Sequence, residues 1–277
     1  MTGPAPDFLA SRARLVDDVL ARLAPPATRP PEAVHRAIRY TLLAPSKRMR
    51  AALTLLSANI CGAEQLAMPA AAAIEMVHAS SLILDDLPAM DNASLRRGRI
   101  ANHREFGEGM AILASVGLLN LAFETIAGAY DAVLAQRLTL LLSRTIGSDG
   151  LIGGQADDLL ARDRRLPLSR LEHIHRRKTA ALFSAAARAG AAAAGADDEL
   201  TELLAAYAER LGVAFQIIDD LLLGDGEIPL FETAADRAEA LQRAQDLRSQ
   251  AIRAITPLGE RAADFRALAA YVIERND

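Results

Sequence analysis

Hydrophobic residues recur with a helical period along most of this chain. The first predicted helix carries its apolar positions at intervals of three and four residues: Phe8, Leu9, Leu15, Val16, Val19, Leu20 and Leu23. Proline pairs at 25–26 and 30–31 end this helix and precede the next one. The same period predicts further helices at about 32–43, 49–61, 68–86, 108–128, 131–147, 169–194, 198–222, 234–256 and 259–274. No segment shows a convincing period of two.

The composition supports a helical domain with a large core. Hydrophobic residues make up 51% of the chain and charged residues 24%, a balance that excludes a disordered protein. Alanine is abundant and aromatic residues reach only 4%, which favours closely packed helices over strands. Because the loops are short and no linker of distinct composition occurs, we expect one all-α domain, a bundle of about ten helices.

Charge and targeting features narrow the class of protein further. The net charge of -4 gives no sign of nucleic-acid binding. The single Cys61 excludes an intramolecular disulfide and fits a reducing compartment. The first residues lack the basic and apolar regions of a signal peptide. The apolar stretch 185–196 is interrupted by Arg188 and is shorter than the roughly 20 residues that span a bilayer. We therefore expect a cytoplasmic protein without stable membrane insertion.

An acidic cluster followed by two arginines is the strongest chemical signal. Asp85, Asp86 and Asp91 come directly after an apolar run, and Arg96 and Arg97 follow them. Magnesium enters proteins through one or two carboxylates, while substrate phosphates fill other positions of its coordination shell. Arginine offers a planar fork of donors that suits phosphate oxygens. The combination predicts a site for a magnesium-bound phosphate or diphosphate.

Helix geometry shows how these aspartates could converge. On an unbroken helix Asp85 and Asp91 would lie about 240° apart around the axis, facing different directions. Pro88 lacks an N–H group and clashes with the preceding turn, so the helix should end or kink there. Asp91 can then return toward Asp85. The simpler alternative is a polar loop whose acids form ion pairs with Arg96 and Arg97.

The stretch from Glu75 to Gly98 resembles the first aspartate-rich motif of trans-isoprenyl diphosphate synthases, and is similar to bacterial geranylgeranyl diphosphate synthases. Other motifs agree in order: Lys47-Arg48-Met49-Arg50, Gly153-Gly154-Gln155-Ala156-Asp157-Asp158-Leu159, Lys178-Thr179-Ala180-Ala181-Leu182-Phe183 and Phe215-Gln216-Ile217-Ile218-Asp219-Asp220. The resemblance covers roughly residues 35–222. It implies one polyprenyl synthetase-like domain over residues 1–277, with helices around a central cavity in the isoprenoid synthase type I fold. It also implies a homodimer, with a heteromer as the alternative.

The resemblance implies a magnesium-dependent transfer of an allylic group to isopentenyl diphosphate, with about three Mg²⁺ ions. The implied catalytic residues are Asp85, Asp86, Asp91, Lys178 and Asp219, and all of these except Lys178 would bind magnesium. The residues implied to hold isopentenyl diphosphate are Lys47, Arg50, His78 and Arg97. Those implied on the allylic side are Arg96, Lys178, Thr179 and Gln216.

Each of these assignments has a simpler structural alternative. Lys47, Arg48 and Arg50 could belong to a solvated basic helix start, and Lys178 to a charged helix face. His78 could be a core histidine, although it lies two helical turns before Asp85 on the same face. Gln155 and Asp158 fit helix packing as well as they fit a site.

The resemblance also bears on the length of the product. In this fold the growing chain descends beside the helix that carries the first motif. The positions four and five residues before Asp85 are Ser81 and Ser80, both small. We therefore expect geranylgeranyl diphosphate (C20) rather than farnesyl diphosphate (C15).

The second aspartate motif departs from the family pattern. Leu223 occupies the position of its third aspartate, and no lysine follows Lys178. In one interpretation Asp225 or Glu227 returns to the metal, and Asp225 follows Asp219 at the same spacing as Asp91 follows Asp85. In another the protein is a weakened synthase or a non-catalytic partner subunit. A third is a terpene cyclase or diphosphate lyase. That class needs no isopentenyl diphosphate site, so the residues implied to form one argue against it.

Overall fold

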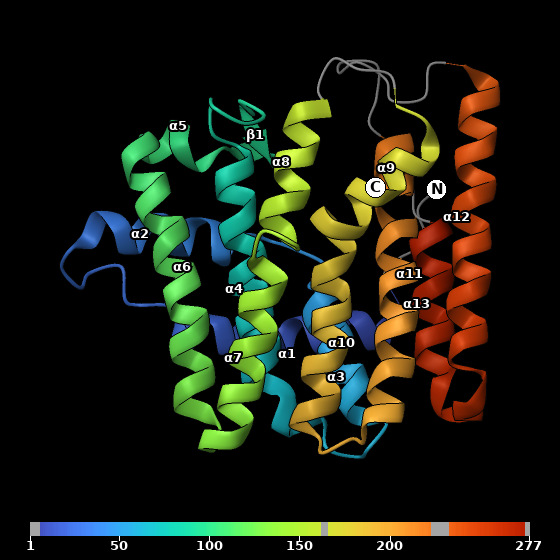
Figure 1. Cartoon of the computed structure of the whole chain (residues 1–277). Coiled ribbons are helices and arrows are strands. Elements are labelled where there is room, and N and C mark those ends of the chain that lie inside the picture. Colours follow the sequence, from blue (N-terminus) through green and yellow to red (C-terminus); the bar gives the residue numbers. More distant parts are fainter. Residues whose placement is uncertain (1–5, 162–165, 223–232, 275–277) are drawn as a thin grey trace.

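The computed structural model describes residues 6–161, 166–222 and 233–274, and these form a bundle of helices (Figure 1). In chain order the helices are α1 (Asp7–Leu23), α2 (Glu32–Leu42), α3 (Met49–Asn59), the 3-10 helix η1 (Glu64–Ala67), α4 (Met68–Asp85), α5 (Asn102–Phe106), α6 (Glu108–Ala129), α7 (Ala132–Ile146), α8 (Leu151–Ala161), α9 (Leu168–His175), the π-helical turn η2 (Arg176–Ala180), α10 (Ala181–Ala193), α11 (Asp198–Leu222), α12 (Ala234–Ala254), the 3-10 helix η3 (Thr256–Ala262) and α13 (Ala263–Glu274). Strands β1 (Leu95–Arg96) and β2 (Arg99–Ile100) form a small hairpin.

The predicted all-α architecture is confirmed, and four local features differ from the prediction. The segment predicted as one helix at 169–194 contains a π-helical turn, η2, between α9 and α10. The last helix begins with 3-10 geometry and becomes α-helical at Ala263. The sequence pattern missed α8, because two adjacent glycines weaken helix propensity there. It also missed the hairpin, since strands of two residues show no periodicity.

Helix α4 runs through the centre of the bundle, packed against α6 on one side and against α3 and α10 on the other. Many of its buried positions are alanines, which allow the helix axes to approach closely. Figure 1 shows the end of α4, the hairpin, α8 and α9 at the same end of the bundle. The predicted site residues that follow α4 therefore lie among several helix ends.

Two helical stretches are long and apolar enough to cross a membrane by length and composition alone: Glu64–Asp85 and Glu108–Ala129. In the first, 67% of the apolar window is buried inside the bundle, as expected for a core helix. In the second, which is α6, only 39% is buried. Part of the apolar surface of α6 thus faces outward.

Candidate functional site

The chain turns back on itself immediately after α4. Helix α4 ends at Asp85, and the backbone N–H of Asp91 donates to the carbonyl oxygen of Asp85 at 2.9 Å. A second bond, from Met90 N to Leu87 O, closes the turn around Pro88. Pro88 has no N–H to continue the helical ladder, so the reversal follows from the sequence. The predicted return of Asp91 to Asp85 is confirmed at the level of the backbone.

The acidic cluster is electrostatically costly without a cation. Burial raises the pKa of Asp85 to about 6. The charges of Asp91 and Asp86 add to this rise, whereas Lys178 and Arg96 oppose it. Burial also raises the pKa of Asp86, against the effect of its hydrogen bond with Arg96. Carboxylates whose charge is disfavoured in this way would be stabilised by a bound divalent cation.

The hairpin brings Arg96 back to the end of α4. Its Nε and Nη2 atoms donate to the same oxygen, Asp86 Oδ1, at 2.9 and 2.5 Å. The Asp86 side chain is almost fully buried, so this contact replaces the hydration that its carboxylate loses. Asp86 thus holds Arg96 in this structure. Its predicted role as a magnesium ligand stays a prediction.

The tip of the hairpin presents Arg97. Leu95 pairs with Ile100 and Arg96 with Arg99, which leaves Arg97 and Gly98 as the two-residue turn. Both have positive φ, 54° and 72°, as a type I′ turn requires. The Arg97 Nη2 atom lies 3.3 Å from Nε2 of His78. The turn therefore places a cation over the side of α4.

His78 joins two arginines from different elements. Its Nε2 atom lies 3.3 Å from Arg50 Nη1 as well as 3.3 Å from Arg97 Nη2. A guanidinium group can only donate, so this ring nitrogen must accept and the imidazole must be neutral. Burial, followed by the charges of Arg50 and Arg97, holds the pKa of His78 well below 6.5. Three of the four residues implied for isopentenyl diphosphate are thereby brought together.

The basic segment before α3 has a divided role. Lys47 lies with its Nζ atom 5.6 Å from the centre of the Tyr271 ring on α13. Arg48 is buried, with Nε 2.8 Å from Asp17 Oδ1 and Nη1 3.4 Å from Glu75 Oε2. Arg48 thus supports the fold.

Arg50, in contrast, belongs to the predicted site. Besides its contact with His78, its guanidinium carbon lies 4.6 Å from the ring centre of Phe183. This cation–π contact holds the guanidinium group beside an aromatic ring on α10.

Lys178 faces the acidic cluster from the π-helical turn η2. Its ammonium group donates to Asp158 Oδ2 at 2.6 Å. Burial alone would lower the pKa of Lys178, but the charges of Asp158, Asp85 and Asp91 outweigh it and raise the pKa. Lys178 therefore stays protonated and lies within electrostatic reach of the carboxylates that follow α4.

Glycines allow two helices to press against η2. A Cβ atom on Gly154 of α8 would lie 2.6 Å from Cα of Lys178, and one on Gly212 of α11 would lie 2.7 Å from Cα of Ala180. Real Cβ atoms do not approach other carbons so closely. Since π-helical turns occur often at functional sites, the location of Lys178 within one agrees with its predicted role.

A polar chain connects η2 with α11. Thr179 Oγ1 donates to Gln216 Oε1 at 2.8 Å, and Gln216 Nε2 donates to Asp220 Oδ1 at 2.9 Å. The other Asp220 oxygen lies 3.0 Å from Nε2 of the buried His175. Asp220 is thus engaged within the protein, while the neighbouring Asp219 is half-buried.

Three positions of the altered second motif, Leu223, Asp225 and Glu227, lie outside the described residues.

The two serines implied in product length occupy different environments. Ser80 is fully buried, and its hydroxyl lies 2.8 Å from the hydroxyl of Ser115 on α6. Ser81 is half-buried and donates to the carbonyl oxygen of His78 at 2.9 Å. Both side chains are satisfied locally by hydrogen bonds.

The residues of the site fit magnesium if phosphate oxygens supply part of its coordination shell. Among the described residues no three His, Cys, Asp or Glu side chains form a ready cluster for a metal ion. Asp86 is engaged by Arg96, and Asp85 and Asp91 are the other two carboxylates of this wall. One or two carboxylates suffice for magnesium when phosphate oxygens complete its shell. The residues present are therefore compatible with a metal that arrives together with a diphosphate.

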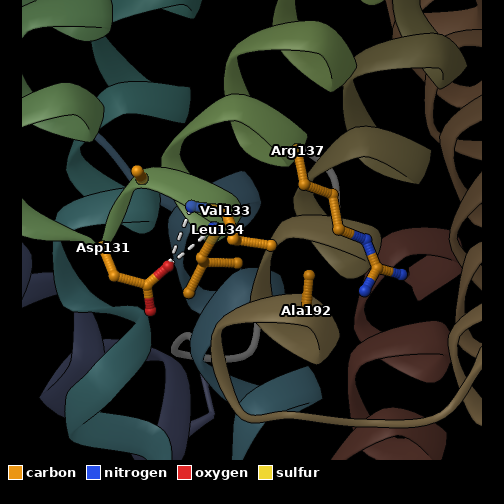
Figure 2. A pocket seen from close by; sticks show the side chains of 6 residues that line it. Asp131, Val133, Leu134, Arg137 and Ala192 are labelled. Atoms are coloured by element: carbon orange, nitrogen blue, oxygen red, sulfur yellow. Dashed lines mark hydrogen bonds between the residues drawn. The ribbon is translucent and has the colours of Figure 1, made fainter.

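A surface cavity of about 650 Å³ lies elsewhere, beside the start of α7 (Figure 2). Its lining includes Asp131, Val133, Leu134, Arg137 and Ala192. Asp131 Oδ1 accepts hydrogen bonds from the backbone of Val133 and Leu134, so its charge already caps α7. This cavity holds none of the predicted site residues.

Sequence reasoning left two parts of the site undecided or unnoticed. Asp158 was equally consistent with helix packing, and the structure gives it the hydrogen bond to Lys178. His175 was not identified at all, because a buried histidine carries no local signal. Only the spacing of Gly153, Gly154 and Asp158 could have indicated the contact with η2.

The fold and this arrangement define an all-α protein that suits a diphosphate held between acidic and basic side chains. The chain belongs to the polyprenyl synthetase family, whose family model, Polyprenyl synthetase, matches residues 31–225. It is 39% identical to a dimethylallyltranstransferase of Fischerella ambigua, over 98% of this chain and 83% of that protein. It is 41% identical to the heterodimeric geranylgeranyl pyrophosphate synthase large subunit 1 of Arabidopsis thaliana, over 78% of this chain and 60% of that protein.

Solved structures of similar proteins confirm the isoprenoid synthase fold. An FPP/GFPP synthase from Zymomonas mobilis superposes with a TM-score of 0.86 at 32% identity, covering 96% of this chain and 97% of that one. A geranylgeranyl pyrophosphate synthetase from the archaeon Geoglobus acetivorans gives a TM-score of 0.85 at 28% identity, covering 97% of this chain and 100% of that one.

Proposed function

We propose that the protein is a magnesium-dependent prenyltransferase that condenses isopentenyl diphosphate with an allylic diphosphate. Its main product would be geranylgeranyl diphosphate, with farnesyl diphosphate as the shorter alternative. One observation carries the proposal. The return of Asp91 to Asp85, the Arg96–Asp86 contact and the reach of Lys178 toward these acids place both signs of charge around one space.

The charged residues would position two diphosphates and neutralise their charge. Arg96 and Lys178 would hold the allylic diphosphate, with Thr179 and Gln216 beside it. Arg50, His78 and Arg97, together with Lys47, would hold isopentenyl diphosphate. Bringing the reacting carbons together in this way converts a bimolecular step into an effectively unimolecular one.

Asp85, Asp91 and, from the opposite side, Asp219 would hold Mg²⁺. The metal ions, when bound, would stabilise the negative charge that develops on the departing diphosphate. The allylic C–O bond breaks, the double bond of isopentenyl diphosphate attacks the allylic carbon, and a proton leaves to the released diphosphate. Lys178 and Arg96 would contribute fixed positive charge next to this leaving group.

The C20 product is supported by the small side chains at positions 80 and 81. Neither serine projects bulk into the space beside α4. Relatives named geranylgeranyl pyrophosphate synthase, at up to 46% identity, agree with this product.

A homodimer is supported by the exposed apolar residues of α6. The exposed side chains are Ile112 (44% exposed), Leu113 (57%) and Val116 (56%). They lie within one turn of the helix, no more than four residues apart. Contiguous apolar surface of this kind usually marks an interface. We propose that a second copy covers this face, and that the protein acts in the cytoplasm.

A role as a weakened synthase or partner subunit is the second candidate. The absence of lysine after Lys178 and the leucine at position 223 favour it. The contacts among Arg50, His78 and Arg97 argue against a cyclase, which would need no second diphosphate site.

The decisive test is a product-length assay. Purified protein with Mg²⁺ and isopentenyl diphosphate is supplied with dimethylallyl (C5), geranyl (C10) or farnesyl (C15) diphosphate, and chain length is measured by chromatography. We expect a C20 product from the primers and none after chelation of the metal. Asp91→Asn should lower kcat by about 100-fold or more. The control Asp198→Asn changes a side chain that is 96% exposed and should leave the rate unchanged.

Three outcomes would contradict the proposal. No longer prenyl diphosphate from any primer would exclude an active synthase. A hydrocarbon or alcohol from a C15 or C20 diphosphate alone would indicate a cyclase or lyase. Activity that appears only after mixing with another synthase subunit would favour the partner role.

A further inference from the structure

Tyr40 lies on α2, outside the acidic cluster, yet it contacts the hairpin that carries Arg96 and Arg97. Its hydroxyl donates to the carbonyl oxygen of Ile100 at 2.9 Å. The guanidinium carbon of Arg99 lies 3.9 Å from the centre of the Tyr40 ring. Arg99 Nη1 also donates to the carbonyl oxygen of Tyr40 at 3.1 Å. One residue of α2 thus binds β2 through its hydroxyl, its ring and its backbone.

Strand pairing makes this contact relevant to Arg96. Arg96 and Arg99 are directly opposite each other in the hairpin, so their side chains leave the same face of the ribbon. Two like charges in this arrangement destabilise a strand pair and compete for the same partners. Here they are separated: Arg96 binds Asp86, and Arg99 is held on the Tyr40 ring.

The residues that follow the hairpin are also attached to α2. Asn102 is buried, and its Nδ2 atom donates to the carbonyl oxygen of Ala37 at 2.9 Å and to Thr41 Oγ1 at 2.8 Å. The Tyr40 and Phe106 rings meet edge to face at 5.3 Å between centres. An isolated two-stranded hairpin is marginally stable in water. Its position over the site must therefore come from contacts such as these.

We propose that Tyr40 and Arg99 form a clamp that positions the hairpin, so that Arg96 and Arg97 point at the diphosphates. Tyr40 is a positioning residue in this proposal, since it touches neither substrate. The effect should be larger on isopentenyl diphosphate, because Arg97 is at the hairpin tip whereas Arg96 has its own anchor on Asp86. This inference rests on the proposed function and adds a determinant on α2 that neither aspartate motif contains.

Two substitutions at Tyr40 remove the contacts of the clamp one step at a time. Tyr40→Phe keeps the ring under Arg99 and removes only the hydroxyl bond to Ile100, so the KM for isopentenyl diphosphate should rise about 3-fold. Tyr40→Leu removes both contacts and should raise this KM by about 10- to 30-fold, with a smaller change in the KM for the allylic diphosphate. In the Tyr40→Leu background, Arg99→Met removes only the remaining bond from Arg99 to the backbone carbonyl of residue 40, so it should raise this KM by less than it does in the wild type.

Tyr130→Phe is a matched control. Its hydroxyl donates to the carbonyl oxygen of Leu66 at 2.8 Å and accepts from the backbone N–H of Ala70 at 3.2 Å, beside the opposite end of α4. Removing it breaks a bond of the same kind and one more, and should lower the melting temperature without changing either KM. If Tyr40→Leu lowers the melting temperature but leaves both KM values at the wild-type level, the clamp is merely structural and the proposal is wrong.

Calorimetric titration with Mg²⁺ and inorganic diphosphate separates this inference from the proposed function. If the wild type forms no prenyl product yet binds diphosphate, and Tyr40→Leu weakens that binding about 10-fold, the proposed reaction fails and the clamp stands. If the wild type is an active synthase and Tyr40→Leu has the same KM values, the clamp proposal is wrong but the proposed function stands. If the wild type neither condenses substrates nor binds diphosphate, both fail.

Discussion

Asp85 occupies an environment in which its own negative charge is unfavourable. Burial and the neighbouring carboxylates raise its pKa to about 6, from 3.8 in a solvent-exposed chain. Between pH 4 and 6 the folded protein therefore binds more protons than the unfolded chain. By linkage, this residue makes the metal-free protein less stable as the pH rises through that window.

Asp85→Asn should remove this penalty. We compare the free energy of unfolding of the variant with that of the wild type, without magnesium. The variant's advantage over the wild type should be about 1–3 kcal/mol larger at pH 7 than at pH 4. Denaturant titrations at both pH values measure this change, and exposed Asp198→Asn provides the control. A difference that is the same at pH 4 and pH 7 would show that Asp85 titrates normally.

Arg48 and Arg50 show how far residue identity alone can mislead. Both appeared in one basic run, and both were open to the interpretation of a solvated helix start. Arg48 lies just before α3 with a left-handed backbone (φ 48°), whereas Arg50 lies in the first turn of that helix, so their side chains reach different partners. Arg48 is buried against Glu75, whereas Arg50 reaches His78. The sequence could identify the cationic segment, but the division of roles depended on which side chains other helices supplied.

At the scale of elements, the turn η2 depends on close contact with α8. Gly154 of α8 leaves room for the backbone of η2, and Gly153 leaves room for the Arg177 side chain. This contact sets the position of Lys178 relative to Asp158. A helix with side chains at those positions would stand farther away.

Gly154→Ala should therefore be costly. The added methyl group would press on Cα of Lys178, and overpacking of this kind costs about 1–3 kcal/mol. Since Lys178 would shift, the KM for the allylic diphosphate should rise as well. Gly128→Ala on α6 has nothing within 4 Å of the new methyl group and should stabilise the protein by about 0.5–1 kcal/mol. Equal and small effects of the two substitutions, in denaturation and in steady-state kinetics, would contradict this account.

The helical pattern predicted most elements because amphipathic periodicity is a local property. The reversal at Pro88 was also predictable, since proline restricts its own backbone and that of its neighbours. The elements that were missed depend on distant contacts. The hairpin is placed by Tyr40 of α2, and α8 by the packing of its glycines on η2. No window of sequence contains both partners of these interactions.

At the scale of the whole molecule, the exposed face of α6 is the feature that a single chain leaves unexplained. Figure 1 shows α6 on one flank of the bundle and α12 on the other. The exposed residues Ile112, Leu113 and Val116 are apolar in a region where a monomer would carry polar side chains.

Val116→Asp should disrupt the proposed homodimer. A charge introduced into a dry interface is unfavourable, so sedimentation equilibrium should show a dissociation constant raised at least about 100-fold. Leu241→Asp, at a position on α12 that is 41% exposed, is the control and should leave the assembly unchanged. A wild-type protein that is monomeric at all concentrations would exclude the dimer.

The turn at Arg97 has a consequence for how this protein can be altered. A left-handed backbone costs an ordinary side chain about 1–2 kcal/mol, and asparagine or glycine would relieve that cost. A selection for thermostability alone would therefore replace this arginine, and with it the cation that faces His78. At residue 97, thermal stability and substrate recognition favour different amino acids. Libraries designed to stabilise the protein should keep residue 97 unchanged.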